Sequence, residues 1–80
     1  MKHFVYVLRS LKVSRRYVGM SKHPDLRLLE HNNGRNKSTK GYMPWEMIYI
    51  EEFETLQEAR NREVFLKSGI GREFLDSLHL

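Results

Sequence analysis

Cysteine is absent from this chain of 80 residues, so disulfide bonds and zinc sites built from thiolates are excluded. Long apolar runs are absent as well, and none approaches the length that a membrane span requires. The first residues lead at once into a short apolar stretch and lack the h-region and cleavage site of a signal peptide. We therefore expect one small domain over residues 1–80 that resides in the reducing cytoplasm and contacts no membrane.

Acidic side chains are scarce in the first half of the chain. Residues 1–44 contain ten lysines and arginines against two acids, whereas residues 45–80 contain four against eight, so the net formal charges are +8 and −4. A basic segment of this density attracts polyanions, and nucleic acid is the partner that it predicts. A basic surface that is merely well solvated is the alternative explanation.

The spacing of apolar residues predicts the element order β-β-α-β-α-α. The link between the first two strands is too short for a crossover, so these strands must be antiparallel. Pro24 can open the first helix and Gly34 can end it, while Thr55 and Glu58 form a capping box for the second. We predict an α+β fold, a three-stranded antiparallel sheet flanked by three helices, with strands at 4–8, 16–20 and 45–53 and helices at 24–33, 55–68 and 72–79.

Two stretches are predicted to interrupt these elements. Residues 34–44 are basic, rich in small polar residues and without periodicity, so we expect a mobile loop. Gly69, Ile70 and Gly71 are expected to break the helical pattern between the last two helices.

Glu63 is the most unusual single residue. On its predicted helix it shares a side with apolar residues that should face the sheet, namely Leu56, Ala59 and Leu66. An ionised carboxylate there needs an opposite charge or a metal ion, because removing water from it is costly. An ion pair with Lys67 or Arg60 is one explanation. A ligand of one Mg²⁺ or Mn²⁺ ion is the other.

The first helix has two contrasting sides. Leu26, Leu28 and Leu29 share one side, and Arg27 and His31 share the opposite one. Arg27 is either an ordinary surface arginine or a fork that binds a phosphate in a bidentate manner. His31 alone is weak evidence, but within a site it can donate to phosphate, shuttle a proton or orient water.

Tyr6 and Tyr17 lie on the first two predicted strands. Strand tyrosines are ordinarily structural. On adjacent antiparallel strands, however, their hydroxyls can meet on one face. A phenol needs a nearby cation to act as a base, and Arg27 or a metal ion can supply it. Gly19 follows the second tyrosine and lets backbone or substrate come close.

Several residues around the basic loop and the last turn of the second long helix are candidates for contacts with nucleic acid. Asn32, Lys37, Lys40 and Lys67 can contact phosphates. Trp45 can stack on a base, although a tryptophan in this position is more often a core residue.

Together these residues resemble the GIY-YIG nuclease family. Phe4-Val5-Tyr6 resembles the first signature tripeptide, with Phe4 in place of its glycine, and Tyr17-Val18-Gly19 matches the second. The helix arginine of the family matches Arg27, and its metal-binding glutamate matches Glu63. The likeness extends over nearly the whole chain and is greatest to small single-domain bacterial members, similar to the N-terminal domain of the excision-repair incision enzyme.

The resemblance implies a divalent-metal-dependent endonuclease that hydrolyses phosphodiester bonds in DNA, in the repair or processing of structured DNA. In this picture Glu63 holds one Mg²⁺ or Mn²⁺ ion, and Tyr6 takes a proton from the attacking water or orients it. Arg27 neutralises charge in the transition state. Tyr17 and His31 position the phosphate or the water.

Two other functions are compatible with the same residues. A non-catalytic module that binds nucleic acid would use the basic half on a nuclease scaffold. A protein adaptor would use the acidic residues of the third strand, residues 51–54, to meet a basic partner. Because the sequence has no attached DNA-recognition domain, a protein partner is expected to supply specificity.

Overall fold

The computed structural model describes all residues from 1 to 80. The chain forms a three-stranded antiparallel sheet from β1 (His3–Ser10), β2 (Arg16–Ser21) and β3 (Trp45–Phe53), in the order β2-β1-β3. The helices are α1 (Pro24–Asn32), α2 (Lys37–Lys40), α3 (Leu56–Lys67) and α4 (Gly69–Ser77). The predicted sheet and the α+β class are confirmed. No helix has the length and apolar character that crossing a membrane requires.

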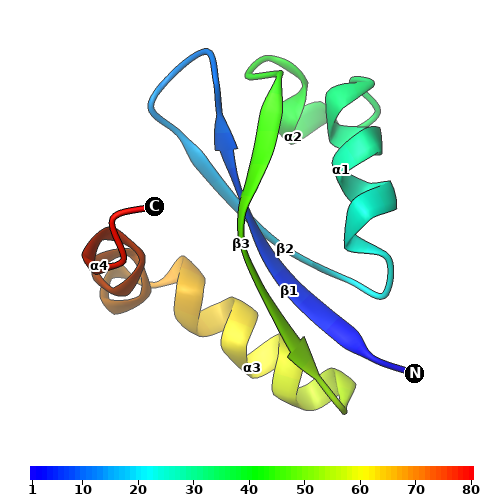
Figure 1. Cartoon of the computed structure of the whole chain (residues 1–80), viewed down its shortest axis with the longest axis vertical. Helices are drawn as coiled ribbons and strands as arrows, with labels where there is room; N and C mark the ends of the chain where they lie inside the picture. Colours follow the sequence, from blue (N-terminus) through cyan, green and yellow to red (C-terminus); the bar gives the residue numbers. More distant parts are fainter.

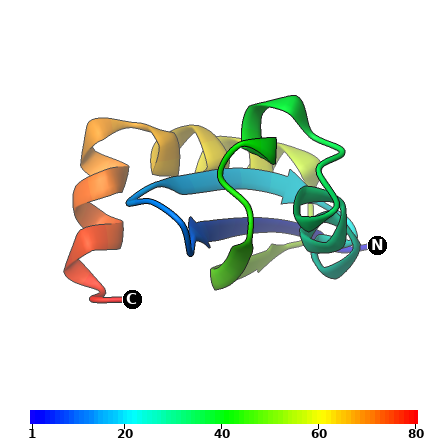
Figure 2. The ribbon, with the colours of Figure 1, turned by 90° about the horizontal axis from the view of Figure 1, so that it is seen from above.

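The sheet lies between two helical layers. Figure 1 shows α1 and α2 on one side of it and α3 and α4 on the other. Viewed from above, in Figure 2, α1 and α4 lie at opposite ends of the sheet. Because helices cover both faces of the sheet, alternate residues of the central strand β1 contribute to two separate clusters, one on each face.

The larger apolar cluster lies beneath α3 and α4. Val5 and Val7 of β1 pack there against Ala59 and Leu66 of α3 and Leu75 of α4, all of them at most 2% exposed. Burial of these side chains is the main apolar contribution to stability. The second cluster lies beneath α1 and α2 and is centred on Tyr6, Leu8 and Trp45. Two of its three central residues therefore have polar atoms that need partners.

Helix α1 turns its polar side to the sheet. His31 is completely buried, whereas Leu26 and Leu29 are 52% and 59% exposed. Only Leu28 of the leucine side packs against the second cluster. The predicted division into a leucine side and a polar side is therefore only partly correct, because Leu28 packs toward the sheet together with His31. The buried imidazole is tolerated because hydrogen bonds described below satisfy it.

The loop predicted at 34–44 contains a short helix that the sequence analysis did not predict. The side chain of Asn36 caps α2 by accepting a hydrogen bond from the backbone N–H of Ser38. Thr39 within it is almost fully buried. Small polar residues that indicated a loop thus have structural roles: Asn36 caps the helix and Thr39 is a core contact.

Helix α4 begins at Gly69, three residues before the predicted start. Ser68 ends α3 and caps α4, because its hydroxyl accepts a hydrogen bond from the backbone N–H of Gly71. A Cβ on Gly71 would lie 2.0 Å from the backbone oxygen of Phe65. Gly71 therefore allows a tight turn between two helices, where we had expected a break of three residues.

The first prediction concerns this turn. Replacing Gly71 with alanine should lower the free energy of unfolding by about 1–3 kcal/mol, because the new methyl group would overlap the backbone of α3. Gly69→Ala is the matched control, since no atom lies within 4 Å of its added Cβ. Urea unfolding followed by circular dichroism measures both, and equal stabilities would contradict the proposed crowding.

Candidate functional site

Tyr6 and Gly19 face each other across the β1–β2 pair. Tyr6 is 1% exposed. A Cβ added at Gly19 would lie 2.5 Å from the Tyr6 hydroxyl oxygen and 2.9 Å from the ring of Tyr17. The space that Gly19 leaves is therefore occupied by Tyr6, and not by the backbone or substrate that the sequence analysis had expected there.

The two signature tyrosines meet on the face covered by α1. Their ring centroids are 6.4 Å apart, and the Tyr17 ring is 4.8 Å from the imidazole of His31. Trp45 closes the cluster, with its centroid 6.4 Å from that of Tyr17. Strand pairing thus places both tyrosine rings on one face of the sheet, beside the histidine of α1.

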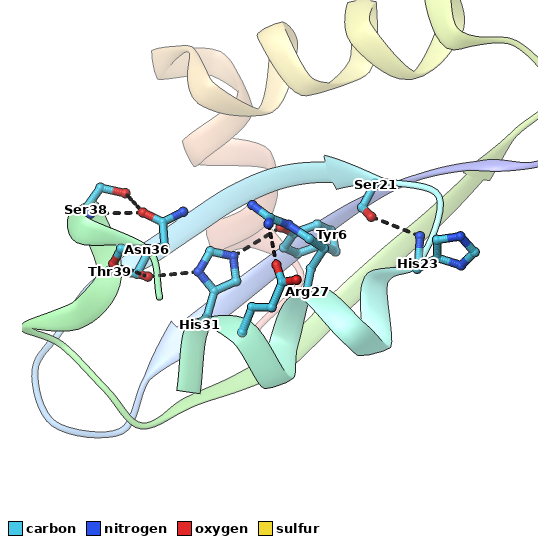
Figure 3. A network of polar contacts seen from close by, with 9 residues as sticks. Tyr6, Ser21, His23, Arg27, His31, Asn36, Ser38 and Thr39 are labelled. Carbon is cyan, nitrogen blue, oxygen red and sulfur yellow. Dashed lines mark hydrogen bonds and ion pairs between the residues drawn. The ribbon is translucent and has the colours of Figure 1, made fainter. Parts of the chain in front are cut away.

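A chain of hydrogen bonds joins Tyr6, His31 and Thr39 (Figure 3). The Tyr6 hydroxyl lies 3.2 Å from Nε2 of His31, and Thr39 Oγ1 lies 2.8 Å from Nδ1. The Thr39 hydroxyl donates to the backbone oxygen of Asn36, so its oxygen accepts the Nδ1–H. Nε2 is then the acceptor for the Tyr6 hydroxyl. Thr39 thus selects the tautomer of His31 that can receive a proton from Tyr6.

Burial moves the pKa values of Tyr6 and His31 in opposite directions. Desolvation raises the pKa of Tyr6, and the Arg27 guanidinium opposes this without reversing it. Desolvation lowers the pKa of His31, and the positive charge of Arg27 lowers it further. Tyr6 is therefore a protonated phenol and His31 a neutral imidazole near pH 7. The expected activation of Tyr6 by a nearby cation does not occur in the free protein.

Arg27 lines a pocket with a volume of about 400 Å³. It forms an ion pair with Glu30, one turn away, which orients its guanidinium beside Tyr6. The lining contains three cationic side chains and one carboxylate, together with an amide and an imidazole: Arg27, Arg35, Lys37, Glu30, Asn36 and His31. A pocket with this excess of positive charge and no apolar lining suits a phosphate group.

Glu63 lies on α3 and does not line this pocket. Its negative charge is close enough to raise the pKa of Tyr6. The carboxylate is 19% exposed, and Oε2 lies 3.2 Å from Nζ of Lys67, which is itself 55% exposed. The ion pair that we considered is therefore present, but it is open to solvent.

No group of three or more histidine, cysteine, aspartate or glutamate side chains is arranged to hold a metal ion. A closed cage such as a structural zinc site is thus excluded. A lone, accessible carboxylate fits Mg²⁺ or Mn²⁺, which retains waters and takes phosphate oxygens as further ligands. Glu63 would have to exchange Lys67 for the ion.

The remaining candidates have different surroundings. The side-chain amide of Asn32 bonds to the backbone of Trp45 at both its nitrogen and its oxygen, at 3.0 and 2.6 Å. It therefore fastens α1 to β3 and is not free to contact phosphate. Trp45 is 3% exposed and cannot stack on a base. Lys37 lines the pocket beside Arg27, whereas Lys40 is exposed outside it.

Three further residues belong to this site although their sequence context did not single them out: Thr39, Glu30 and Arg35. Thr39 lies in a segment without periodicity, and its role depends on the position of His31. Glu30 is placed three residues after Arg27, a spacing that does predict an ion pair on a helix. Arg35 follows Gly34, whose φ of 74° redirects the chain toward the pocket.

Comparison with known proteins supports a common origin. Residues 2–72 match the family model described as the GIY-YIG catalytic domain. A UPF0213 protein of Staphylococcus saprophyticus is 37% identical over 68 residues, which are 84% of this chain and 82% of that protein. A UPF0213 protein of Clostridium perfringens is 36% identical over 66 residues, covering 81% and 70%. The solution NMR structure of the UPF0213 protein from Bacillus halodurans superposes with a TM-score of 0.59 at 31% identity, covering 98% of this chain and 85% of that one.

The second prediction concerns the pH dependence of stability. Because the pKa of folded His31 lies below its ordinary 6.5, the unfolded chain binds the proton more readily. The contribution of neutral His31 to stability is complete above about pH 6.5 and is lost as the pH falls through the lowered value of the folded state. Urea unfolding between about pH 8 and pH 5 should show a smaller loss in His31→Gln than in the unaltered protein. Parallel curves would contradict this assignment.

Proposed function

The chain belongs to the family of GIY-YIG catalytic domains, and on this premise we propose that it is a divalent-metal-dependent endonuclease that hydrolyses phosphodiester bonds in DNA. We further propose that it acts in the repair or processing of structured DNA. The observation that supports catalysis most directly is geometric. The buried hydroxyl of Tyr6 lies 3.2 Å from Nε2 of His31 and beside the guanidinium of Arg27, which lines the basic pocket.

In this proposal the proton of the attacking water passes through Tyr6 to His31. The Tyr6 oxygen accepts a proton from the water while its own proton moves to Nε2 of His31, 3.2 Å away. The imidazolium that forms keeps its Nδ1–H on Thr39. A phenol with a raised pKa can therefore serve as a base, because it never needs to exist as a phenolate.

The other side chains act on the phosphate. Arg27 and Lys37 in the pocket of about 400 Å³ bind its oxygens and offset the negative charge that grows in the transition state. Glu63 would hold one Mg²⁺ or Mn²⁺ ion. Such an ion, when bound, supplies Lewis-acid stabilisation of the scissile phosphate and of the leaving oxygen. Tyr17 packs against His31 and maintains its orientation.

A non-catalytic module that binds nucleic acid is the second candidate function. It is favoured by the ion pair between Glu63 and Lys67 and by the lack of a clustered set of metal ligands. Both functions would use the same basic pocket for phosphate. They differ in whether the protein cleaves the strand, a step for which Glu63 would be needed.

The third prediction separates these candidates. Glu63→Gln should lower Mg²⁺- or Mn²⁺-dependent nicking of branched, flapped and single-stranded oligonucleotides at least about a hundredfold, because the neutral amide oxygen is a much weaker ligand for the ion than the carboxylate. Binding of the same oligonucleotides, measured in EDTA, should persist.

The control for this variant is Glu73→Gln, which removes an exposed carboxylate of α4 that takes part in no ion pair. Nicking that survives Glu63→Gln unchanged would refute the proposed metal ligand. Tight binding without nicking by the unaltered protein would favour the non-catalytic module.

The fourth prediction concerns Thr39. Thr39→Val keeps the shape of the side chain but removes the acceptor for Nδ1–H, so His31 can adopt the tautomer that no longer receives the Tyr6 proton. We expect kcat to fall about ten- to a hundredfold with little change in KM, and Thr39→Ser to restore it. Thermal melting controls for folding. Equal kcat values for the valine and serine variants would exclude a positioning role for this hydroxyl.

A further inference from the structure

The pocket beside Arg27 contains one carboxylate that opposes the binding of phosphate. Glu30 lines this pocket together with three cationic side chains, those of Arg27, Arg35 and Lys37. Its Oε1 lies 2.5 Å from Nη1 of Arg27. Arg35 and Lys37 form no ion pair. A phosphate that enters the pocket must therefore take Arg27 from Glu30, and the same carboxylate repels it as it approaches.

The end of helix α1 holds Glu30 in this position. Its carbonyl oxygen accepts hydrogen bonds from the backbone N–H groups of Asn33 and Arg35, at 3.2 and 3.1 Å. The carboxylate stands three residues after Arg27, a spacing at which side chains of a helix meet. The side chains of Arg27 and Glu30 are 39% and 41% exposed, so the ion pair can open without unfolding of the helix.

Arg27 meets two groups at the same time. Its guanidinium lies beside the hydroxyl of Tyr6 while it pairs with Glu30. A free arginine side chain samples many rotamers, and the ion pair restricts them. Glu30 therefore prepares Arg27 for its contact with Tyr6 before the substrate arrives. The carboxylate thus favours turnover by orienting Arg27 and weakens phosphate binding by competing for it, two effects of opposite sign.

A single phosphate and a phosphate within a strand respond differently to this competition. Glu30 lowers the local affinity for both by the same factor. A strand carries further phosphates that can reach Lys37 in the pocket and Lys40, which is exposed outside it. Once the first contact has formed, these further contacts are intramolecular and compensate for the loss. Inorganic phosphate and mononucleotides have no neighbouring phosphodiesters with which to compensate.

We propose that Glu30 is a positioning residue that also excludes free phosphate from the site. It holds Arg27 beside Tyr6 and yields this contact only to a phosphate that belongs to a nucleic-acid strand. The pocket therefore discriminates against inorganic phosphate and mononucleotides at concentrations at which a strand still binds. The identity of the strand rests on the proposed function, whereas the competition for Arg27 involves only residues of the pocket.

The first test titrates inorganic phosphate in the absence of metal ions and follows the Nε–H signal of Arg27 by NMR. Glu30→Gln should raise the affinity for phosphate about three- to tenfold, because a negative charge leaves the pocket and Arg27 loses its partner. Glu30→Asp keeps the charge and should stay within about twofold of the unaltered protein. Equal affinities of Glu30→Gln and the unaltered protein would overturn the proposed exclusion of phosphate.

Asp76→Asn is the matched control for the change in net charge. It removes another partly exposed carboxylate that pairs with an arginine, Arg16, but that does not line this pocket. The affinity for inorganic phosphate should therefore remain that of the unaltered protein. An increase as large as that of Glu30→Gln would show that net charge, and not competition at Arg27, governs phosphate binding, and would overturn the proposal.

Nicking of an oligonucleotide with Mg²⁺ or Mn²⁺ gives the second readout. Glu30→Gln should lower KM about three- to tenfold and also lower kcat by a similar factor, because the strand binds more readily while Arg27 is less well oriented. A carboxylate with a merely structural role would not tighten binding when removed. A lower KM with unchanged kcat would overturn the positioning role. Absence of nicking by the unaltered protein would refute the proposed function, and the phosphate titration would then decide on Glu30 alone.

Discussion

The hydrogen bonds of one buried histidine determine how helix α1 lies on the sheet. His31 has no exposed surface, and its two ring nitrogens are satisfied by Tyr6 from β1 and Thr39 from α2. An imidazole left unpaired in this position would cost about 1–3 kcal/mol, so both hydrogen-bond partners favour the burial of His31. With them in place, the helix exposes Leu26 and Leu29 and brings Arg27 to the Tyr6 hydroxyl.

The same arrangement sets the chemistry available to the site. Burial keeps the phenol of Tyr6 protonated and the imidazole of His31 neutral, so the pair can receive a proton without an ionised tyrosine. Helix α3 contributes the carboxylate of Glu63 from the other layer of the fold. Its accessible ion pair with Lys67 leaves the carboxylate available for exchange with a cation. Apolar packing positions α3 and hydrogen bonding positions α1, and together they bring Glu63 close enough to affect the Tyr6 hydroxyl.

Glycine permits close contact at two positions for different reasons. At Gly19 the missing side chain makes room for the ring of Tyr6, and the catalytic tyrosine of our proposal depends on that space. At Gly71 it lets α4 turn tightly against the end of α3. This turn places Leu75 in the apolar cluster beneath α3 and α4, against Val5 and Val7 of the sheet.

The amino-acid sequence by itself determined the antiparallel sheet, most element boundaries and the family, because apolar runs, helix caps and signature spacing are local properties of the chain. It also indicated Tyr6, Tyr17, Arg27 and Glu63 as one set. Only the tertiary structure decided that His31 is buried, that Thr39 positions it and that Asn32 fastens Trp45. Those roles depend on partners that are remote in sequence, and a helix wheel or a loop composition contains no information about which polar group will meet them.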